Sequence, residues 1–328
     1  MKKTSKLFFA VCALGALAFL MGSCKKDDDS KGYTIGLPQF EDEVDGRAYV
    51  DFTVNKFKWN ANDQVAIYNL DAVTPANSEM AIYQTTASAE GQTLASFTYA
   101  SGDKLSAKKD GYFVFYPVSK LGNWDKESGN YQYFNVSATQ TYTVIDDNVT
   151  VDPESMALAC NLSKLGGTFT LKHIFGNLRL KLTGAGSVTS IVVEDARFNL
   201  SGTVGMKLHE VNMNTFTTLQ NQFIASDDPY NAAFGTAWAE YANTLGYTTQ
   251  GEGNTITLDC GEGVKLNETS ETHFFIGLRP GALKYGFKVK VYVLGNAEPY
   301  VFDYTGNNNL HYGIKAGVNK GLSLAGID

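Results

Sequence analysis

The 328-residue chain is acidic, with a formal net charge of −7, and it contains 32 glycines but only 7 prolines. An acidic chain without a basic stripe lacks the electrostatic footprint that nucleic-acid binding requires, so nucleic acid is not expected as a partner. Abundant glycine, tyrosine and phenylalanine are typical of short strands joined by tight turns. Composition therefore favours a mainly β protein.

Residues 1–23 have the pattern of a secretion signal. Lys2, Lys3 and Lys6 supply a positive start, and residues 7–21 form an apolar run that is too short for an ordinary membrane span. Removing this segment changes the formal charge from −7 to −10, because three lysines leave with it. About 300 residues remain, which is enough for one large or two ordinary domains, and two are favoured.

The signal segment ends in Leu20-Met21-Gly22-Ser23-Cys24, with small side chains directly before a cysteine. This ending resembles the lipobox of bacterial lipoproteins, in which a signal peptidase cuts before a cysteine that carries acyl chains, although Met21 stands where leucine is commoner. The resemblance implies a palmitate-type anchor on Cys24, and each buried methylene of such chains contributes about 0.8 kcal/mol to membrane attachment. The alternative is an ordinary signal peptide with a chance cysteine.

Residues 24–46 are predicted to form a tether, because Lys25–Ser30 is a charged tract that cannot bury itself. This basic and then acidic tract also resembles the export signal that carries Bacteroidetes lipoproteins to the outer leaflet of the outer membrane. The localisation that this implies is the cell outer membrane, lipid-anchored and surface-exposed.

Cys160 and Cys260 are the cysteines that remain after Cys12 leaves with the signal and Cys24 is lipidated. They can pair in an oxidising compartment or persist as two buried thiols. The four histidines are widely scattered and no Cys-x-x-Cys spacing occurs, so neither a metal site nor a cofactor is expected. No nucleophile elbow, supported carboxylate pair or phosphate-cradling loop is convincing, so the protein is predicted not to be an enzyme.

Residues 47–152 are predicted to form an antiparallel β domain, because short apolar or alternating runs are separated by glycines. Trp59 continues an every-second-residue apolar pattern with Phe57 and is expected in the core. The expected strands cover Ala48–Val54, Val65–Tyr68, Met80–Tyr83, Leu94–Tyr99, Tyr112–Tyr116 and Tyr131–Val136.

Residues 153–328 are predicted to form a second antiparallel β domain, so the chain is expected to be mainly β, with two tandem antiparallel domains. The boundary is placed near residue 153, where acidic, proline and glycine residues interrupt the periodicity. One amphipathic helix is predicted between a cap at Asp227 or Asp228 and Gly246, with an aromatic stripe that is expected to pack on this domain; a ligand groove is the alternative. The expected strands cover Phe169–Leu171, Leu178–Leu182, Val188–Val193, Thr255–Leu258, Thr272–Leu278, Phe287–Leu294 and Tyr300–Tyr304.

Several segments together carry a family resemblance. Phe57-Lys58-Trp59-Asn60-Ala61-Asn62-Asp63 runs into an apolar strand, and a later strand ends in Phe113-Val114-Phe115-Tyr116-Pro117. In the second half, Pro153-Glu154-Ser155-Met156-Ala157 leads to a histidine-containing strand around His173, and Phe275-Ile276-Gly277-Leu278-Arg279-Pro280 follows later. These patterns resemble the Bacteroidetes fimbrillin-like lipoproteins over most of the mature chain.

The resemblance implies two β-sandwich-like domains and a role in cell adhesion or as a pilus subunit, with other surface subunits or host surface molecules as partners. Assembly in polymerising members proceeds by strand exchange, in which a sheet edge accepts a foreign strand. In some relatives a protease first cuts after a basic residue, and Arg47 is the candidate here; an ordinary surface arginine is the alternative. Tyr312–Leu324 is the expected last strand, and no spare donor strand is evident beyond it, which favours a tip or accessory subunit over a stalk subunit.

Glycan binding is the competing function. Trp124 lies in Gly122-Asn123-Trp124-Asp125, a polar turn setting in which an exposed ring can stack on a sugar. Tyr131 and Tyr133 share one face of the following strand and can extend such a platform, although same-face tyrosines more often pack on neighbours.

Overall fold

The computed structural model describes residues 33–36, 50–51, 56–86, 92, 94–106, 110–145, 148–164, 168–195, 199–213, 247–279, 282–283, 286–305, 314 and 319–328. The predicted signal segment, Cys24, Arg47 and the helix predicted between Asp227 and Gly246 lie outside these residues. Over the ranges just given, no helix is long and apolar enough to cross a membrane. The prediction of a mainly β chain with several antiparallel sheets is confirmed.

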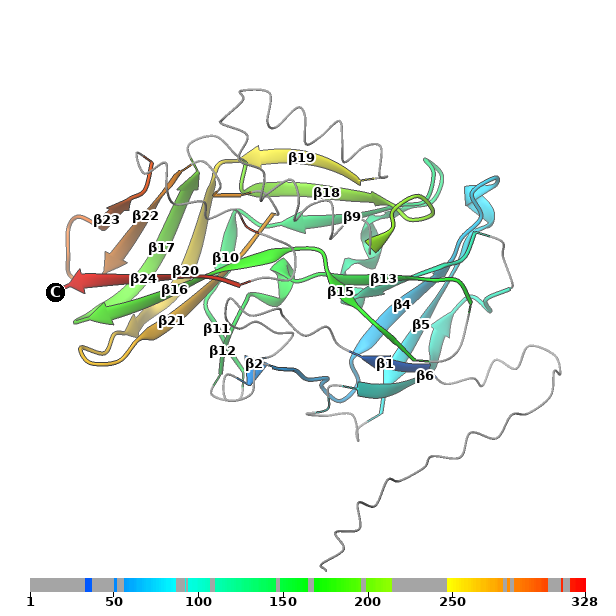
Figure 1. Ribbon diagram of the computed structural model, residues 1–328, viewed down its shortest axis with the longest axis horizontal. Helices are drawn as coiled ribbons and strands as arrows, with labels where there is room; N and C mark the ends of the chain where they lie inside the picture. Colours follow the sequence, from blue (N-terminus) through cyan, green and yellow to red (C-terminus); the bar gives the residue numbers. More distant parts are fainter. Residues whose placement is uncertain are drawn as a thin grey trace, which may run out of the picture.

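The largest sheet has eight strands and occupies the right-hand part of Figure 1. In spatial order they are β14 (Thr168–Thr170), β1 (Tyr33–Gly36), β6 (Leu94–Gly102), β5 (Glu79–Thr85), β4 (Gln64–Asn69), β7 (Tyr112–Tyr116), β13 (Leu158–Leu162) and β15 (Lys172–His173). Its two outermost strands, β14 and β15, belong to one continuous stretch, residues 168–173. The sheet therefore curls until its two ends meet in that stretch.

Two further sheets face each other in the left-hand part of Figure 1. One contains β10 (Thr139–Thr141), β20 (Thr255–Lys265), β17 (Ser187–Asp195), β22 (Phe287–Val293) and β23 (Tyr300–Asp303). The other contains β21 (Thr272–Leu278), β16 (Gly176–Gly184) and β24 (Asn319–Ile327), and here β24 runs parallel to β16. Gly184 permits this docking, because a Cβ at that position would lie 2.0 Å from the Ile327 carbonyl oxygen.

A four-stranded sheet lies between these two parts. It contains β19 (Tyr247–Gly253), β18 (Ser201–Lys207), β9 (Tyr131–Val136) and β8 (Trp124–Asp125). Small hairpins and short helical turns complete the described structure: β2 (Val50–Asp51) with β3 (Lys56–Phe57), β11 (Thr143–Ile145) with β12 (Asn148–Thr150), and the 3-10 turns η1 (Pro75–Asn77), η3 (Val118–Asn123) and η4 (Pro153–Ser155).

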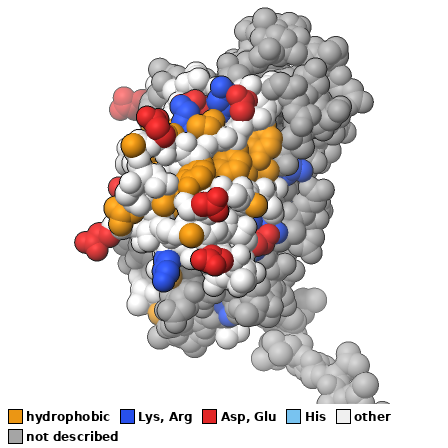
Figure 2. All heavy atoms as spheres, turned by 90° about the vertical axis from the view of Figure 1, so that its left-hand side faces the viewer, with side chains coloured by type: hydrophobic (Ala, Val, Ile, Leu, Met, Phe, Trp, Pro, Cys, Tyr) orange, Lys and Arg blue, Asp and Glu red, His pale blue; other side chains and the backbone are white. Residues whose placement is uncertain are grey.

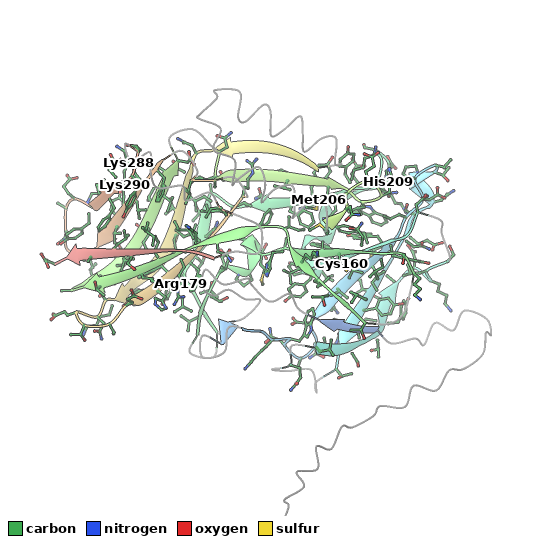
Figure 3. The ribbon with its side chains drawn as sticks, viewed as in Figure 1. Cys160, Arg179, Met206, His209, Lys288 and Lys290 are labelled. Carbon is green, nitrogen blue, oxygen red and sulfur yellow. The ribbon has the colours of Figure 1, made fainter. Side chains whose placement is uncertain are left out.

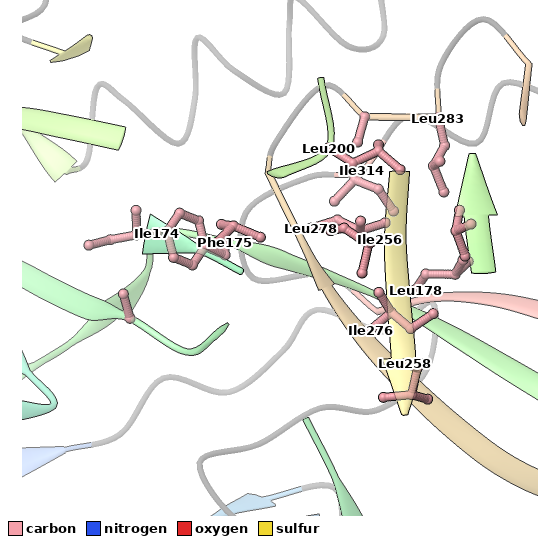
Figure 4. Close-up of a cluster of buried hydrophobic side chains, with 14 of the residues drawn as sticks. Ile174, Phe175, Leu178, Leu200, Ile256, Leu258, Ile276, Leu278, Leu283 and Ile314 are labelled. Atoms are coloured by element: carbon pink, nitrogen blue, oxygen red, sulfur yellow. The ribbon is translucent and has the colours of Figure 1, made fainter. Parts of the chain in front are cut away.

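Alternation of side chains along the strands builds two hydrophobic cores. The smaller core fills the inside of the curled sheet and includes Trp59, which is fully buried as predicted. The larger core is continuous from the outside of that sheet, where Phe115 meets Phe134 of β9 at 4.8 Å between ring centroids, to the facing sheets at the other end. Figure 4 shows Leu178 and Ile276 gathered with Ile256 from the opposite sheet.

Two features are not apparent from the sequence pattern. β1 lies inside residues 24–46, the segment predicted to be a tether, because a four-residue strand carries too little periodicity to be seen. Arg179 alternates with buried leucines on β16, yet it is itself only 5% exposed. Its guanidinium lies 5.9 Å from the centre of the Phe275 ring and 3.1 Å from His273 Nδ1, so the second face of β16 is covered at this position.

The predicted domain boundary near residue 153 falls in η4. Strands from both sides of it share sheets, because β13 and β15 follow it but join the first sheet, whereas β9 and β10 precede it but pair with later strands. The division of the chain into two separable domains therefore remains a prediction.

Candidate functional site

β1 lies between β14 and β6 in the curled sheet. It pairs antiparallel with β6, from Tyr33 opposite Phe97 to Gly36 opposite Leu94, and parallel with β14. Among the described strands, no pairing joins β6 to β14 directly. Removal of β1 would therefore leave two unpaired sheet edges side by side, and unpaired edges are templates for an incoming strand.

The interior next to β1 is apolar. Ala95 and Phe97 of β6 are 4% and 0% exposed, and Leu171, which follows β14, is fully buried. Trp59 stands edge-on to Phe97, with 4.8 Å between ring centroids. Loss of β1 would uncover a groove that offers both main-chain hydrogen bonds and apolar burial, the two requirements for strand addition.

Arg47 lies in the sequence between β1 and β2 and outside the described residues. A cut after Arg47 would separate β1 from every later strand of the chain. Arg47 was predicted from the sequence as a processing site, whereas β1 was not predicted. The alternating pair Tyr33 and Ile35 was the available signal, and it was hidden by the polar segment around it.

Asp63 brings a carboxyl group into the wall of the same core. It closes a tight turn at the start of β4, where its Oδ2 accepts a hydrogen bond from the Asn60 N–H at 2.7 Å. Its Oδ1 accepts a longer one, 3.3 Å, from the Tyr116 hydroxyl. Burial raises the pKa of Asp63 to about 6, because the two hydrogen bonds only partly offset the loss of hydration.

Trp124 lies on the core side of the four-stranded sheet. It stands opposite Gln132 in the β8–β9 pair, and Gln132 is fully buried. The Trp124 ring packs on Tyr68 at 4.7 Å between centroids, and the Lys126 amine lies 5.3 Å from the ring centre. This ring is therefore half-buried packing, not the exposed platform that its turn setting predicted.

Tyr131 and Tyr133 project from the opposite face of β9. Their rings stack, with 5.8 Å between centroids and 15° between planes. Asp125 and Lys207 flank Tyr131 on the neighbouring strands, and Gly205 beside Tyr133 has no side chain to cover the ring. The structure keeps the two tyrosines together and separates them from Trp124, so the three rings do not form one surface.

The remaining chemistry-bearing residues are dispersed. Within the part of the chain that the structure describes, no group of three or more His, Cys, Asp or Glu side chains could hold a metal ion. Cys160 and Cys260 are free and buried, and burial raises the pKa of each thiol to about 12. Burial lowers the pKa of His173 to about 3, which keeps its ring neutral.

Comparison with known proteins gives structural likenesses only. The chain matches no protein-family model, and a search of curated proteins finds no match. It is similar to a solved structure from Bacteroides ovatus ATCC 8483 provisionally assigned as a cell adhesion protein, with 13% identity, a TM-score of 0.47, and coverage of 90% of this chain and 92% of the other. A second Bacteroides ovatus ATCC 8483 structure, provisionally assigned as an adhesin, shows 9% identity, a TM-score of 0.29, and coverage of 87% and 88%. At these identities and TM-scores, function has to be argued from the residues of this chain.

Proposed function

We propose that this protein is a lipid-anchored surface protein, held through Cys24 until it is processed, and that it acts in cell adhesion, or as a pilus tip or accessory subunit, by exchanging β1 for a strand of another subunit. The observation that supports the proposal is the position of β1: it alone bridges β6 and β14 among the described strands, and it precedes Arg47. The fimbrillin-like resemblance in sequence points the same way. No catalytic step and no cofactor belong to this function.

Processing at Arg47 is the first test. Mass spectrometry of surface protein from intact cells should find an N-terminus at Ala48, together with a denaturation-resistant ladder on gels. Arg47→Ala should abolish both, because β1 then stays attached and its place in the sheet stays filled. Lys31→Ala is the matched control, since it removes the basic residue on the other side of β1 and should leave the N-terminus and the ladder unchanged. A lipid-bearing Cys24 and a single monomer band in the wild-type protein would contradict strand exchange.

Glycan binding is a second candidate, and the stacked tyrosines favour it. Two parallel half-buried rings present apolar surface to a sugar, and the charged groups of Asp125 and Lys207 lie beside them. The Tyr133 hydroxyl can donate a hydrogen bond, because a tyrosine is protonated at neutral pH, and burial followed by Asp125 and Tyr131 raises its pKa further.

Variants on the two faces of the four-stranded sheet can be compared directly. The double change Tyr131→Ala and Tyr133→Ala should abolish retention of the protein on polysaccharide gels and leave its stability nearly unchanged. Trp124→Ala should instead lower the free energy of unfolding by about 2 kcal/mol, because packing on Tyr68 is lost, and should leave retention intact. Retention that survives the double tyrosine change would rule out this surface as the glycan site.

A further inference from the structure

On the outer face of the five-stranded sheet, part of the surface around β22 and β23 is apolar. Along β22, the residues Lys288, Lys290 and Tyr292 point outward, whereas the intervening valines are buried. Tyr292 is 36% exposed, and Leu294, which follows the strand, is 65% exposed. Val301 of β23 lies opposite Lys290 and is 54% exposed. Figure 2 shows a band of hydrophobic side chains across this end of the molecule.

The other half of this face is charged but balanced. Lys288 contacts Asp303 at 2.9 Å, and Lys290 contacts Glu194 at 2.5 Å. Figure 3 shows both lysines side by side near β22 and β23. These two ion pairs leave the part of the face around β22 and β23 without net charge, whereas the chain as a whole carries −7. The apolar residues Tyr292, Leu294 and Val301 and these two ion pairs are called the β22–β23 surface below.

β23 also presents an open edge. Among the described strands it pairs only with β22. The Tyr304 N–H donates to the Phe287 carbonyl at 2.9 Å, and the direction of main-chain groups alternates along an antiparallel pair. The N–H and C=O groups of Val301 and Asp303 therefore point away from β22, toward the free side of the strand.

From these observations we infer that the β22–β23 surface is an interface between two copies of this chain, related by a two-fold axis, with β23 pairing antiparallel to its counterpart. A two-fold interface must be complementary to itself, and a face with balanced charges meets its copy without the repulsion that the acidic chain imposes elsewhere. The interface uses the end of the molecule remote from β1 and does not rest on strand exchange.

The register follows from the side chains. Pairing Asp303 with its copy would place two carboxylates opposite each other, which is unfavourable on a sheet face. Pairing Val301 with Val301 of the copy brings the apolar halves together. Pro299 lacks an N–H and ends the ladder after a few residues, so the contact belongs to the weak, reversible class of interfaces.

Thiol trapping in the full chain tests the register. Val301→Cys should form a disulfide-linked dimer under mild oxidation, because directly opposite residues in a hydrogen-bonded antiparallel pair lie about 5.5 Å apart at Cα, within disulfide range. Val73→Cys is the matched control: Val73 is 90% exposed but lies in the loop after β4, and should give no dimer. Cys160 and Cys260 are buried in both variants.

Sedimentation of the full chain tests the apolar contact independently. Leu294→Asp should raise the dimer dissociation constant at least about tenfold, because it places a charge in the apolar half. A monomer at all concentrations, a dimer that the Val301→Cys thiols do not trap, or equal trapping through Val73→Cys would each overturn the inference.

Discussion

Replacing Trp59 with alanine should lower the free energy of unfolding by about 4 kcal/mol. The indole is fully buried inside the curled sheet, 4.8 Å from Phe97 and 5.5 Å from Tyr116 between ring centroids, and edge-on to both. Removing it takes away apolar burial and two aromatic contacts and leaves a cavity that a closed sheet cannot easily collapse. Urea unfolding followed by far-ultraviolet circular dichroism measures the change.

Trp59→Phe is the control for this prediction, because it keeps a ring in the same place and should cost less than half as much. The damage should also be local, since Trp59 belongs to the smaller core and not to the larger one. Hydrogen exchange should therefore accelerate in β4 and β6 and change little in β17 and β22. A loss below about 1 kcal/mol for Trp59→Ala would mean that the indole does not fill this core.

Local alternation explains which parts of the fold the sequence predicts well. Leu178, Leu180 and Leu182 alternate along β16, and all three are fully buried. The same pattern along β22 correctly separates buried valines from half-buried lysines. Trp59 was placed in the core by the same argument. Each of these predictions needs only the period of one strand, which the sequence displays directly.

Pairing between distant strands explains what the sequence could not supply. The closure of the first sheet depends on β1 meeting β14, which lies more than one hundred residues later, and no local pattern encodes that contact. The residues of the candidate glycan site show the same distinction between local pattern and long-range pairing. Strand period alone places Tyr131 and Tyr133 on one face, and the structure agrees. The side on which Trp124 lies depends on its register opposite Gln132, which only the folded sheet reveals.

Asp63→Asn should stabilise the protein at neutral pH by up to about 3 kcal/mol. An unperturbed aspartate has a pKa near 3.9, whereas burial raises the pKa of Asp63 to about 6 in the folded chain. The folded state thus holds the Asp63 proton more tightly than the unfolded state. Relative to its ionised form, the protonated carboxyl favours folding below about pH 4, and this advantage is lost as the pH rises to about 6. Above pH 6 the ionised carboxyl therefore destabilises the native state, relative to a side chain that does not ionise, by the full difference of about two pKa units.

Asparagine removes that dependence and keeps the local hydrogen bonds. Its amide oxygen can still accept from the Asn60 N–H, and its amide nitrogen can donate to the Tyr116 oxygen. Urea midpoints measured between pH 4 and 7.5 should therefore diverge, with the variant gaining on the wild type as the pH rises and the two curves meeting near pH 4. Glu127→Gln, which removes one charge at an exposed position, is the control and should shift the midpoint little. Parallel curves for Asp63→Asn and wild type across this range would show that the carboxyl of Asp63 is hydrated, and that the wall of the closed sheet is open to water at this turn.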